Sequence, residues 1–149
     1  MSFVRLLAGR GLIVSSIAAG LLLAFATGFG RAADSFPFDR DLLLDVAPMR
    51  PVKRVPILAV SENGNATIGL WCKTVPGRVT IADKEIHIES GPLPDALPQY
   101  MSDGQCTPER MQADADTLAA LTQVTTWRRR GELIVLLGPT ALTFRPSDH

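Results

Sequence analysis

The chain has no excess of charge of either sign, because fifteen Lys and Arg residues balance fifteen Asp and Glu residues. Charged residues make up only 20% of the sequence. This balance excludes the strongly basic surface typical of nucleic-acid-binding proteins. Hydrophobic residues reach 46%, which excludes an intrinsically disordered chain. A length of 149 residues excludes two large folded domains. We therefore expect one globular domain that does not bind nucleic acid.

Catalytic motifs are also lacking. The sequence contains no Gly-x-Ser-x-Gly nucleophile motif, no phosphate-binding loop and no closely spaced pair of metal ligands. Histidine occurs only as His87 and His149. We therefore predict no catalytic residue, no cofactor and no metal site.

The N-terminal region has the order of a secretory signal. Arg5 and Arg10 precede residues 12–29, which contain no ionisable side chain. A retained membrane anchor is the alternative, because the run approaches the roughly 20 apolar residues that span a bilayer. We expect residues 1–33 to be a signal peptide or N-terminal anchor. Residues 34–149 are then the folded domain, exported to the periplasm or cell envelope.

Removal of the leader changes the charge of the chain. It takes away Arg5, Arg10 and Arg31 and no acid, which leaves 12 basic against 15 acidic side chains, formally −3. A net acidic domain disfavours a cationic surface for DNA or anionic lipid. We expect an envelope protein or a small ligand as partner, with membrane contact only through an N-terminal anchor.

Two cysteines, Cys72 and Cys106, lie in the expected mature part. An even count in an oxidising compartment predicts one disulfide. Reactive or metal-binding thiols and unpaired buried thiols are the alternatives. A redox pair more often has two cysteines two residues apart at a helix start, and this spacing differs. A structural Cys72–Cys106 bridge is the preferred interpretation.

Hydrophobic alternation predicts a chain of short strands separated by turns. The predicted strands cover residues 42–46, 55–60, 66–72, 78–82, 85–89, 124–128, 133–137 and 141–144. The Asn and Gly residues at 62–65 predict a hairpin turn, and Pro76–Gly77 predicts a second turn. The strands at 78–82 and 85–89 are expected to form a hairpin through Asp83–Lys84. Residues 90–104 are rich in Pro and Gly and predict a long surface loop.

A helix start is predicted at Thr107, Pro108 and Glu109. The Thr hydroxyl can accept a hydrogen bond from a free backbone N–H group, Pro fits the first helical position, and the Glu carboxylate interacts favourably with the positive end of the helix dipole. The helix is expected to run to about Leu121. Asp114 and Asp116 are expected to face water, and the predicted inward residues are Met111, Ala115, Leu118, Ala119, Leu121 and Thr122.

Two further groups of residues have a structural and a functional interpretation. His87 lies between Glu85 and Glu89 on the strand face that is expected to be exposed to solvent. Its structural interpretation is a solvated residue. Its functional interpretation is a metal ligand, or a general acid and base that acts with one of those carboxylates. Residues 128–130 are three arginines expected to gather at one turn, as a solvated cluster or as an anion site.

The order of elements resembles a known family. The residues that carry the resemblance are Gly69-Leu70-Trp71-Cys72, residues 86–91, Cys106-Thr107-Pro108-Glu109-Arg110 and the closing hairpin at 133–144. Over residues 41–145 the chain is similar to the META domain, the HslJ-like family. Family members usually have Asn directly after the first Cys, whereas this chain has Lys73.

The resemblance implies a small α+β domain, with a curved, mainly antiparallel sheet and one helix. Family members occur largely in bacterial envelopes, are associated with heat stress, drug resistance or motility, and are not known as enzymes. We therefore expect an exported, non-catalytic binding or structural module that is related to stress. A redox protein using Cys72 and Cys106, or an enzyme using His87, are the alternatives.

Overall fold

A computed structural model describes residues 35–51 and 53–148 of the chain. The described residues form eight strands and two helices. In chain order these are β1 (Asp41–Leu44), β2 (Ile57–Val60), β3 (Asn65–Gly69), β4 (Thr74–Ala82), β5 (Glu85–Ser90), α1 (Pro98–Ser102), α2 (Pro108–Thr122), β6 (Thr126–Arg130), β7 (Leu133–Leu137) and β8 (Leu142–Pro146). The predicted leader, residues 1–33, lies outside the described residues, so its role stays a prediction.

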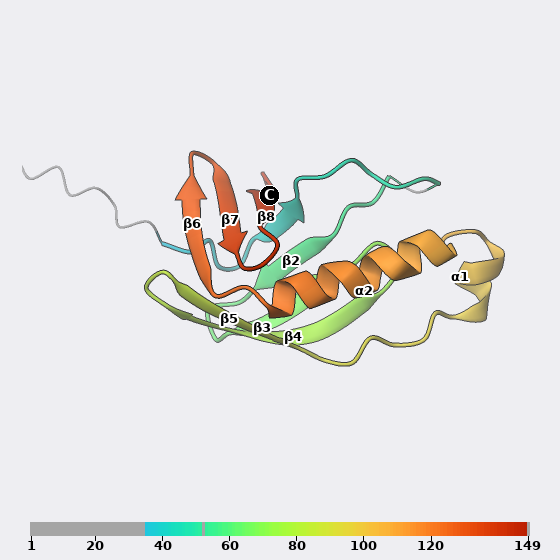
Figure 1. The fold of residues 1–149 in the computed structure, drawn as a ribbon, viewed down its shortest axis with the longest axis horizontal. Helices are drawn as coiled ribbons and strands as arrows, with labels where there is room; N and C mark the ends of the chain where they lie inside the picture. Colours follow the sequence, from blue (N-terminus) through green and yellow to red (C-terminus); the bar gives the residue numbers. More distant parts are fainter. Residues whose placement is uncertain (1–34, 52, 149) are drawn as a thin grey trace, which may run out of the picture. The chain divides into compact units, whose positions relative to one another are not determined.

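The strands form one antiparallel sheet that closes on itself. Each strand pairs with the next along the chain, and β8 returns to pair with β1, which makes a closed barrel (Figure 1). A curved, mainly antiparallel sheet accompanied by a helix is therefore confirmed, in agreement with an α+β class. The short helix α1 was not predicted.

The barrel interior is filled by side chains that alternate along the strands. Residues at every second position point inward, as β-pleating requires. The buried apolar set from the strands includes Leu42, Leu44, Leu58, Val60, Ala66, Ile68, Val75, Val79, Ile86, Ile88, Trp127, Ile134, Leu136, Leu142 and Phe144. Cross-strand registers such as Leu58 opposite Ile68 and Val79 opposite Ile88 bring these residues together.

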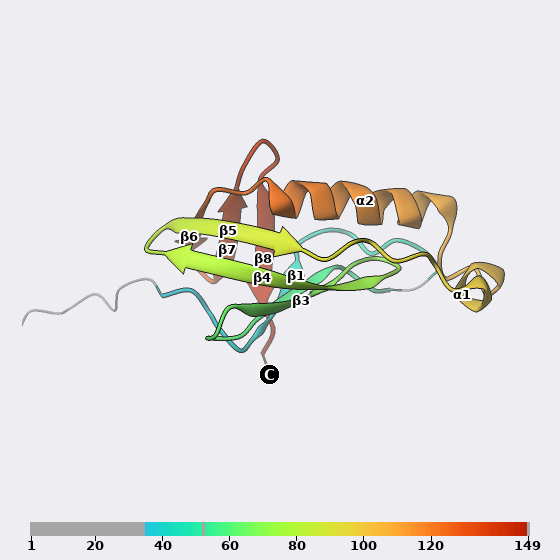
Figure 2. The same cartoon turned by 90° about the horizontal axis from the view of Figure 1, so that it is seen from below.

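The junction between β5 and β6 is the weakest join in the barrel. Only Glu85 and Thr126 pair there in register, supported by Ile86 N donating to Thr125 O at 3.0 Å and Trp127 N to Lys84 O at 2.8 Å. Helix α2 runs beside β5 (Figure 2). Its Leu118 and Leu121 belong to the same buried cluster as the strand residues. The helix therefore packs beside β5, where β6 contributes only one residue pair.

Aromatic side chains pack against the β4–β5 turn. Trp127 is buried, its Nε1 donates to Asp83 O at 2.9 Å, and Phe36 meets its ring edge-on at 5.3 Å between centroids. The Lys84 ammonium lies 4.3 Å from the Trp127 ring centroid, a cation–π contact. These contacts hold the β4–β5 turn, which lies at Asp83–Lys84 as predicted.

The predicted hairpin turn at 62–65 is also confirmed. Gly64 N donates to Ser61 O at 2.8 Å and Ser61 N donates to Asn65 O at 2.9 Å. Gly64 has a φ of 82°, and a Cβ there would lie 2.7 Å from Val79 O. The turn therefore requires glycine for its backbone angle and for the close approach of β4.

The predicted turn at Pro76–Gly77 is wrong, because both residues lie inside β4. Pro76 O accepts a bond from Gly91 N at 2.8 Å, beyond the end of β5. In an antiparallel strand the nitrogen and the carbonyl of one residue point to the same neighbouring strand. At Pro76 that neighbour is β5, which has already ended, so no strand pairing requires the N–H group that proline lacks. The turn lies instead at residues 70–73, where Leu70 N donates to Lys73 O at 2.7 Å.

The predicted inward face of the helix is wrong in part. The buried residues of α2 are Arg110, Asp114, Leu118 and Leu121, whereas Ala115 and Ala119 are exposed and Met111 and Thr122 are half-buried. Asp116 is exposed as expected, but Asp114 is not. The helix is rotated from the predicted orientation because its two buried charged residues bond to the 70–73 turn.

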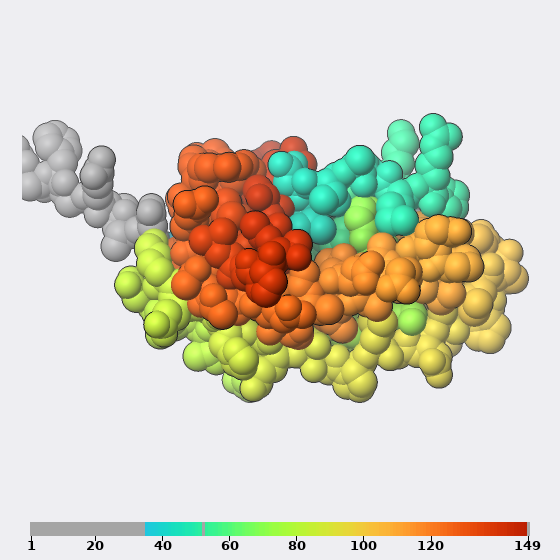
Figure 3. Space-filling view, viewed as in Figure 1, coloured from blue at the N-terminus to red at the C-terminus, as the bar shows by residue number. Residues whose placement is uncertain are grey.

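The expected loop at 90–104 is mostly irregular but contains α1. Tyr100 O accepts bonds from Gln105 N and Cys106 N, both at 3.0 Å, which folds the segment back toward α2. Figure 3 shows α2 at the surface, with this segment on one side and the segment that follows β1 on the other. The loop thereby comes to flank the start of the helix.

Truncation of Leu121 tests whether α2 is part of the core. We expect Leu121→Ala to lower the free energy of unfolding by about 2–5 kcal/mol, because Leu121 is fully buried in the cluster that closes the barrel. Ala119→Ser, on the exposed face of α2, should change it by less than about 0.5 kcal/mol. Urea denaturation measures both, and equal effects would contradict the observed helix orientation.

Candidate functional site

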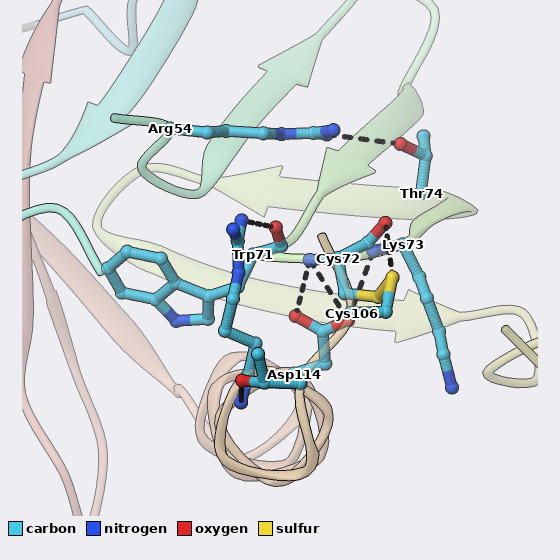
Figure 4. Close-up of a disulfide and its surroundings, with 9 residues drawn as sticks. Arg54, Trp71, Cys72, Lys73, Thr74, Cys106 and Asp114 are labelled. Carbon is cyan, nitrogen blue, oxygen red and sulfur yellow. Dashed lines mark hydrogen bonds between the residues drawn. A yellow bond between two sulfur atoms is a disulfide. The ribbon is translucent and has the colours of Figure 1, made fainter. Parts of the chain in front are cut away.

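A buried carboxylate joins α2 to the β3–β4 turn. Asp114 has 0% exposed surface, and its Oδ1 accepts a bond from Cys72 N at 3.0 Å. Its Oδ2 accepts from Lys73 N at 3.0 Å and from Cys72 N at 3.2 Å. Figure 4 shows Asp114 reaching from the helix to these N–H groups beside the disulfide. Backbone donors that no strand uses are thereby satisfied.

A buried arginine contacts the same turn from one helical turn earlier. Arg110 is 2% exposed, and its Nη2 donates a hydrogen bond to the Trp71 carbonyl oxygen. Its Nε and Nη1 are buried and have no acceptor among residues 35–51 and 53–148. Unpaired buried donors are uncommon in proteins and call for an explanation.

The disulfide holds the two segments that meet at this point. Cys72 in the turn is bonded to Cys106, with 5.3 Å between their Cα atoms. Thr107 follows directly and caps α2, its hydroxyl oxygen accepting from Arg110 N at 3.3 Å, and Pro108 occupies the first helical turn. The predicted cysteine pair and helix start are thus both present. Together they fix where Arg110 and Asp114 leave the helix.

Burial and hydrogen bonding act in opposite directions on Asp114. Burial raises the pKa of its carboxyl above the ordinary value of 3.8, and the N–H bonds from the 71–73 turn and the charge of Lys73 partly oppose that rise. At Glu109 the pKa is lowered, because its own backbone N–H and the Thr107 side chain bond to the carboxylate. The helix start therefore favours the ionised form of Glu109.

A pocket of about 520 Å³ opens beside the disulfide. We call it the bridge pocket. Its lining residues are Arg54, Trp71, Cys72, Lys73, Thr74, Pro94, Asp95, Ala96, Leu97, Tyr100, Gln105, Cys106 and Arg110. One wall is thus formed by residues 71–74 and the start of α2, and the other by residues 94–105.

Arg54 extends the charged part of the pocket. Its Nη2 donates to Thr74 Oγ1 at 3.3 Å, across the turn from α2 (Figure 4). A Cβ at Gly69 would lie only 3.0 Å from this Nη2. Glycine at position 69 therefore leaves the room that the Arg54 guanidinium occupies.

The other wall of the bridge pocket, residues 94–105, exposes large apolar side chains beside the polar Asp95 and Gln105. Leu97 is 52% exposed and Tyr100 is 40% exposed, unlike most large apolar side chains of the domain. Both belong to the segment that the disulfide fastens to the turn. The pocket therefore places an exposed apolar surface opposite basic side chains.

His87 and the three arginines are not brought to this pocket. His87 is exposed on β5, with its Nε2 3.6 Å from Glu89 Oε1. On β6, Arg128 and Arg130 are exposed on one face, whereas Arg129 points to the other face and its Nη2 donates to Ser35 O at 3.2 Å. The expectation that residues 128–130 gather at one turn is wrong, because strand alternation separates Arg129 from its neighbours.

Arg54, Arg110 and Asp114 were not predicted as site residues. A signal existed for two of them, since residues 110, 114, 118 and 121 are spaced as one helical face that contains Leu118 and Leu121. Two opposite charges on an apolar face indicate buried polar bonds to another element. Arg54 carried no such signal, because it precedes β2 and meets Thr74 only through the sheet register.

Asp114 makes stability depend on pH in a defined direction. Between pH 3.8 and its raised pKa, the folded chain binds more protons than the unfolded chain, so the free energy of unfolding decreases as pH rises through this interval. Asp114→Asn removes this titration. We therefore expect wild type to lose stability relative to Asp114→Asn over that interval, measured by urea denaturation at each pH. A stability difference that is constant with pH would contradict the raised pKa.

Removal of the disulfide tests its structural contribution. Cys72 and Cys106 are 34 residues apart, and loop-closure entropy for this length predicts a loss of about 4 kcal/mol in the double variant Cys72→Ala/Cys106→Ala. Denaturant unfolding under oxidising conditions measures the loss. Thr74→Ala at the same turn is the control and should stay within about 1 kcal/mol of wild type. A loss below about 1 kcal/mol in the double variant would contradict a structural bridge.

Among the described residues, no helix has the length and hydrophobicity to cross a membrane. Within the same ranges, no three His, Cys, Asp or Glu side chains are grouped as metal ligands would be. No protein-family model, no curated protein and no solved structure matches the chain. The resemblance to the META domain therefore stays a prediction, and inferences about function rest on the geometry of the bridge pocket.

Proposed function

We propose that this chain is an exported, non-catalytic binding module of the cell envelope and that the bridge pocket holds its ligand. The observation that carries the proposal is the pocket of about 520 Å³ beside the Cys72–Cys106 bridge. Its volume lies within the range of roughly 300–1,000 Å³ found for small-molecule sites. A small ligand therefore fits the site better than an envelope protein.

The walls of the bridge pocket are fixed by contacts that do not depend on a ligand. The turn wall is held by the Asp114 bonds and the opposite wall by the disulfide and the Tyr100 carbonyl. A preformed site loses less conformational entropy on binding than a flexible one. The arrangement supports recognition of one kind of ligand and includes no pair of groups in contact that suits acid–base catalysis.

Export and family membership complete the proposal. Arg5 and Arg10 before an uncharged apolar run support a secretory leader, and a disulfide is typical of oxidising compartments. The antiparallel sheet, the capped helix and the bridge support a META or HslJ-like domain related to stress. Membrane contact is then made only by a retained N-terminal anchor.

A redox role for Cys72 and Cys106 has less support. Cys106 is 3% exposed and Cys72 is half-buried, and thiol exchange requires access of an attacking thiolate to one of the two sulfur atoms. The bridge also fastens the wall of the pocket to the turn, which gives it a structural task. We therefore propose the binding module ahead of a redox protein.

Filling the bridge pocket tests the proposed function. Ala96→Trp places a large side chain in the lining, so we expect it to abolish ligand binding, whereas Ala115→Trp adds the same side chain on the exposed face of α2 and should not. Ligand-observed NMR with the oxidised protein recovered from cells, against small acids, amides, amines and sugars, measures binding. Absence of any binding, or binding unchanged by Ala96→Trp, would contradict the proposal.

A further inference from the structure

We infer that the bridge pocket selects small organic oxyanions, with a carboxylate or phosphate head on an apolar body. This inference rests on the proposed function, because it names the ligand class of the same pocket. Two features of the lining carry it: a buried guanidinium with unused donors, and an accessible apolar wall opposite the basic side chains.

The guanidinium of Arg110 has more donors than its protein contacts use. It lines the pocket, is 2% exposed and bonds to one neutral acceptor, Trp71 O, while Nε and Nη1 have none in the described part of the chain. Buried donors without acceptors are costly. An oxyanion in the pocket brings acceptor oxygens and a negative charge to this guanidinium, and arginine matches carboxylate and phosphate groups particularly well.

Asp114 lies one helical turn from Arg110, but among the described residues no hydrogen bond or ion pair joins the two side chains. Both of its oxygens already accept bonds from Cys72 N and Lys73 N. The guanidinium donors of Arg110 are therefore left for another acceptor. Asp114 fixes the turn against which Arg110 is placed, and so acts on the structure of the site.

The charges around the pocket favour an anion. Its lining contains Arg54, Lys73 and Arg110 against one acid, Asp95, which is exposed. Cations still outnumber acids when the buried Asp114 is counted. The domain as a whole is expected to be net acidic, so this excess of positive charge is a local property of the pocket. Low-dielectric surroundings strengthen such attraction relative to open solvent.

The opposite wall determines the rest of the ligand. Leu97 and Tyr100 expose large apolar surfaces there, and Pro94 and Ala96 lie in the same segment. Water is displaced favourably from such surfaces by an apolar group. A bare inorganic anion would leave this wall uncovered, whereas an aliphatic or aromatic acid covers it.

Matched pairs of acids and amides test the charge preference. The probes are phenylacetate with phenylacetamide, octanoate with octanamide, and phenyl phosphate, titrated into the oxidised protein and followed by two-dimensional ¹H–¹⁵N NMR. We expect the acid of a pair to bind at least about tenfold tighter than its amide, because bonds from a charged donor to an oxyanion are roughly twice as strong as neutral ones. Shifts should centre on residues 71–74 and 94–97. Comparison of phenyl phosphate with phenylacetate identifies the preferred head group.

Variants assign the preference to named residues. Arg110→Gln should reduce the ratio of amide to acid dissociation constants several-fold, and Arg110→Lys should retain more of it. Arg129→Gln removes a guanidinium outside the pocket and should leave the ratio unchanged. If Arg110→Gln does not fold, Arg54→Gln/Lys73→Gln leaves the bond to Trp71 O intact and should still reduce the ratio several-fold.

The outcomes separate this inference from the proposed function. Equal binding of acids and amides in the pocket, or binding of neutral compounds but of none of the acids, would overturn the inference and leave the binding module standing. Absence of binding by every probe and every compound of the earlier panel would overturn both. An acid preference that survives Arg110→Gln and Arg54→Gln/Lys73→Gln would also overturn the inference, because it would place the anion elsewhere.

Discussion

The three hydrogen bonds that Asp114 accepts from the backbone of Cys72 and Lys73 determine how the helix meets the barrel. They fix the rotation of α2, and this rotation directs Leu118 and Leu121 into the core and Arg110 toward Trp71 O. The β5–β6 junction has one residue pair in register, so closure of the hydrophobic interior depends on the helix that these bonds orient. One buried carboxylate thus links strand pairing, core packing and the geometry of the bridge pocket.

The disulfide and the polar bonds act on the same turn for different physical reasons. The bridge restricts the unfolded chain and fastens the irregular segment after β5 to the turn. The bonds of Arg110 and Asp114 instead satisfy backbone groups that the turn removes from the sheet. Their combination leaves a pocket with basic side chains on one wall and exposed Leu97 and Tyr100 on the other. That asymmetry is the basis of the proposed binding function and of its preference for an amphiphilic anion.

Much of the fold follows from local patterns in the sequence. Alternation of apolar residues located part of each strand, although the predicted strand 66–72 runs into the turn at 70–73 and the predicted strand 78–82 lacks the first half of β4. The Asn and Gly residues at 62–65 located a hairpin, and Thr107 with Pro108 located the helix start. Local rules failed at Pro76–Gly77, since Pro76 lies in β4 opposite Gly91, the first residue after β5, and Gly77 packs closely against Glu89 O of β5. They failed again for the helix face, because Ala115 and Ala119 were predicted to point inward along with Leu118 and Leu121. Arg110 and Asp114 take those inward positions instead, and their hydrogen-bond partners lie about 40 positions away in the sequence.

The sequence by itself determined the strand pattern, the capped helix and the presence of a cysteine pair, because each depends on neighbours within a few residues or on a simple count. Only the tertiary structure decided that Arg110 and Asp114 are buried and that Arg54, Lys73 and the segment from 94 to 105 surround one pocket. The reason is that burial of Arg110 and Asp114 depends on hydrogen bonds to backbone groups about 40 residues away in the sequence. The positions of those backbone groups are set by closure of the barrel.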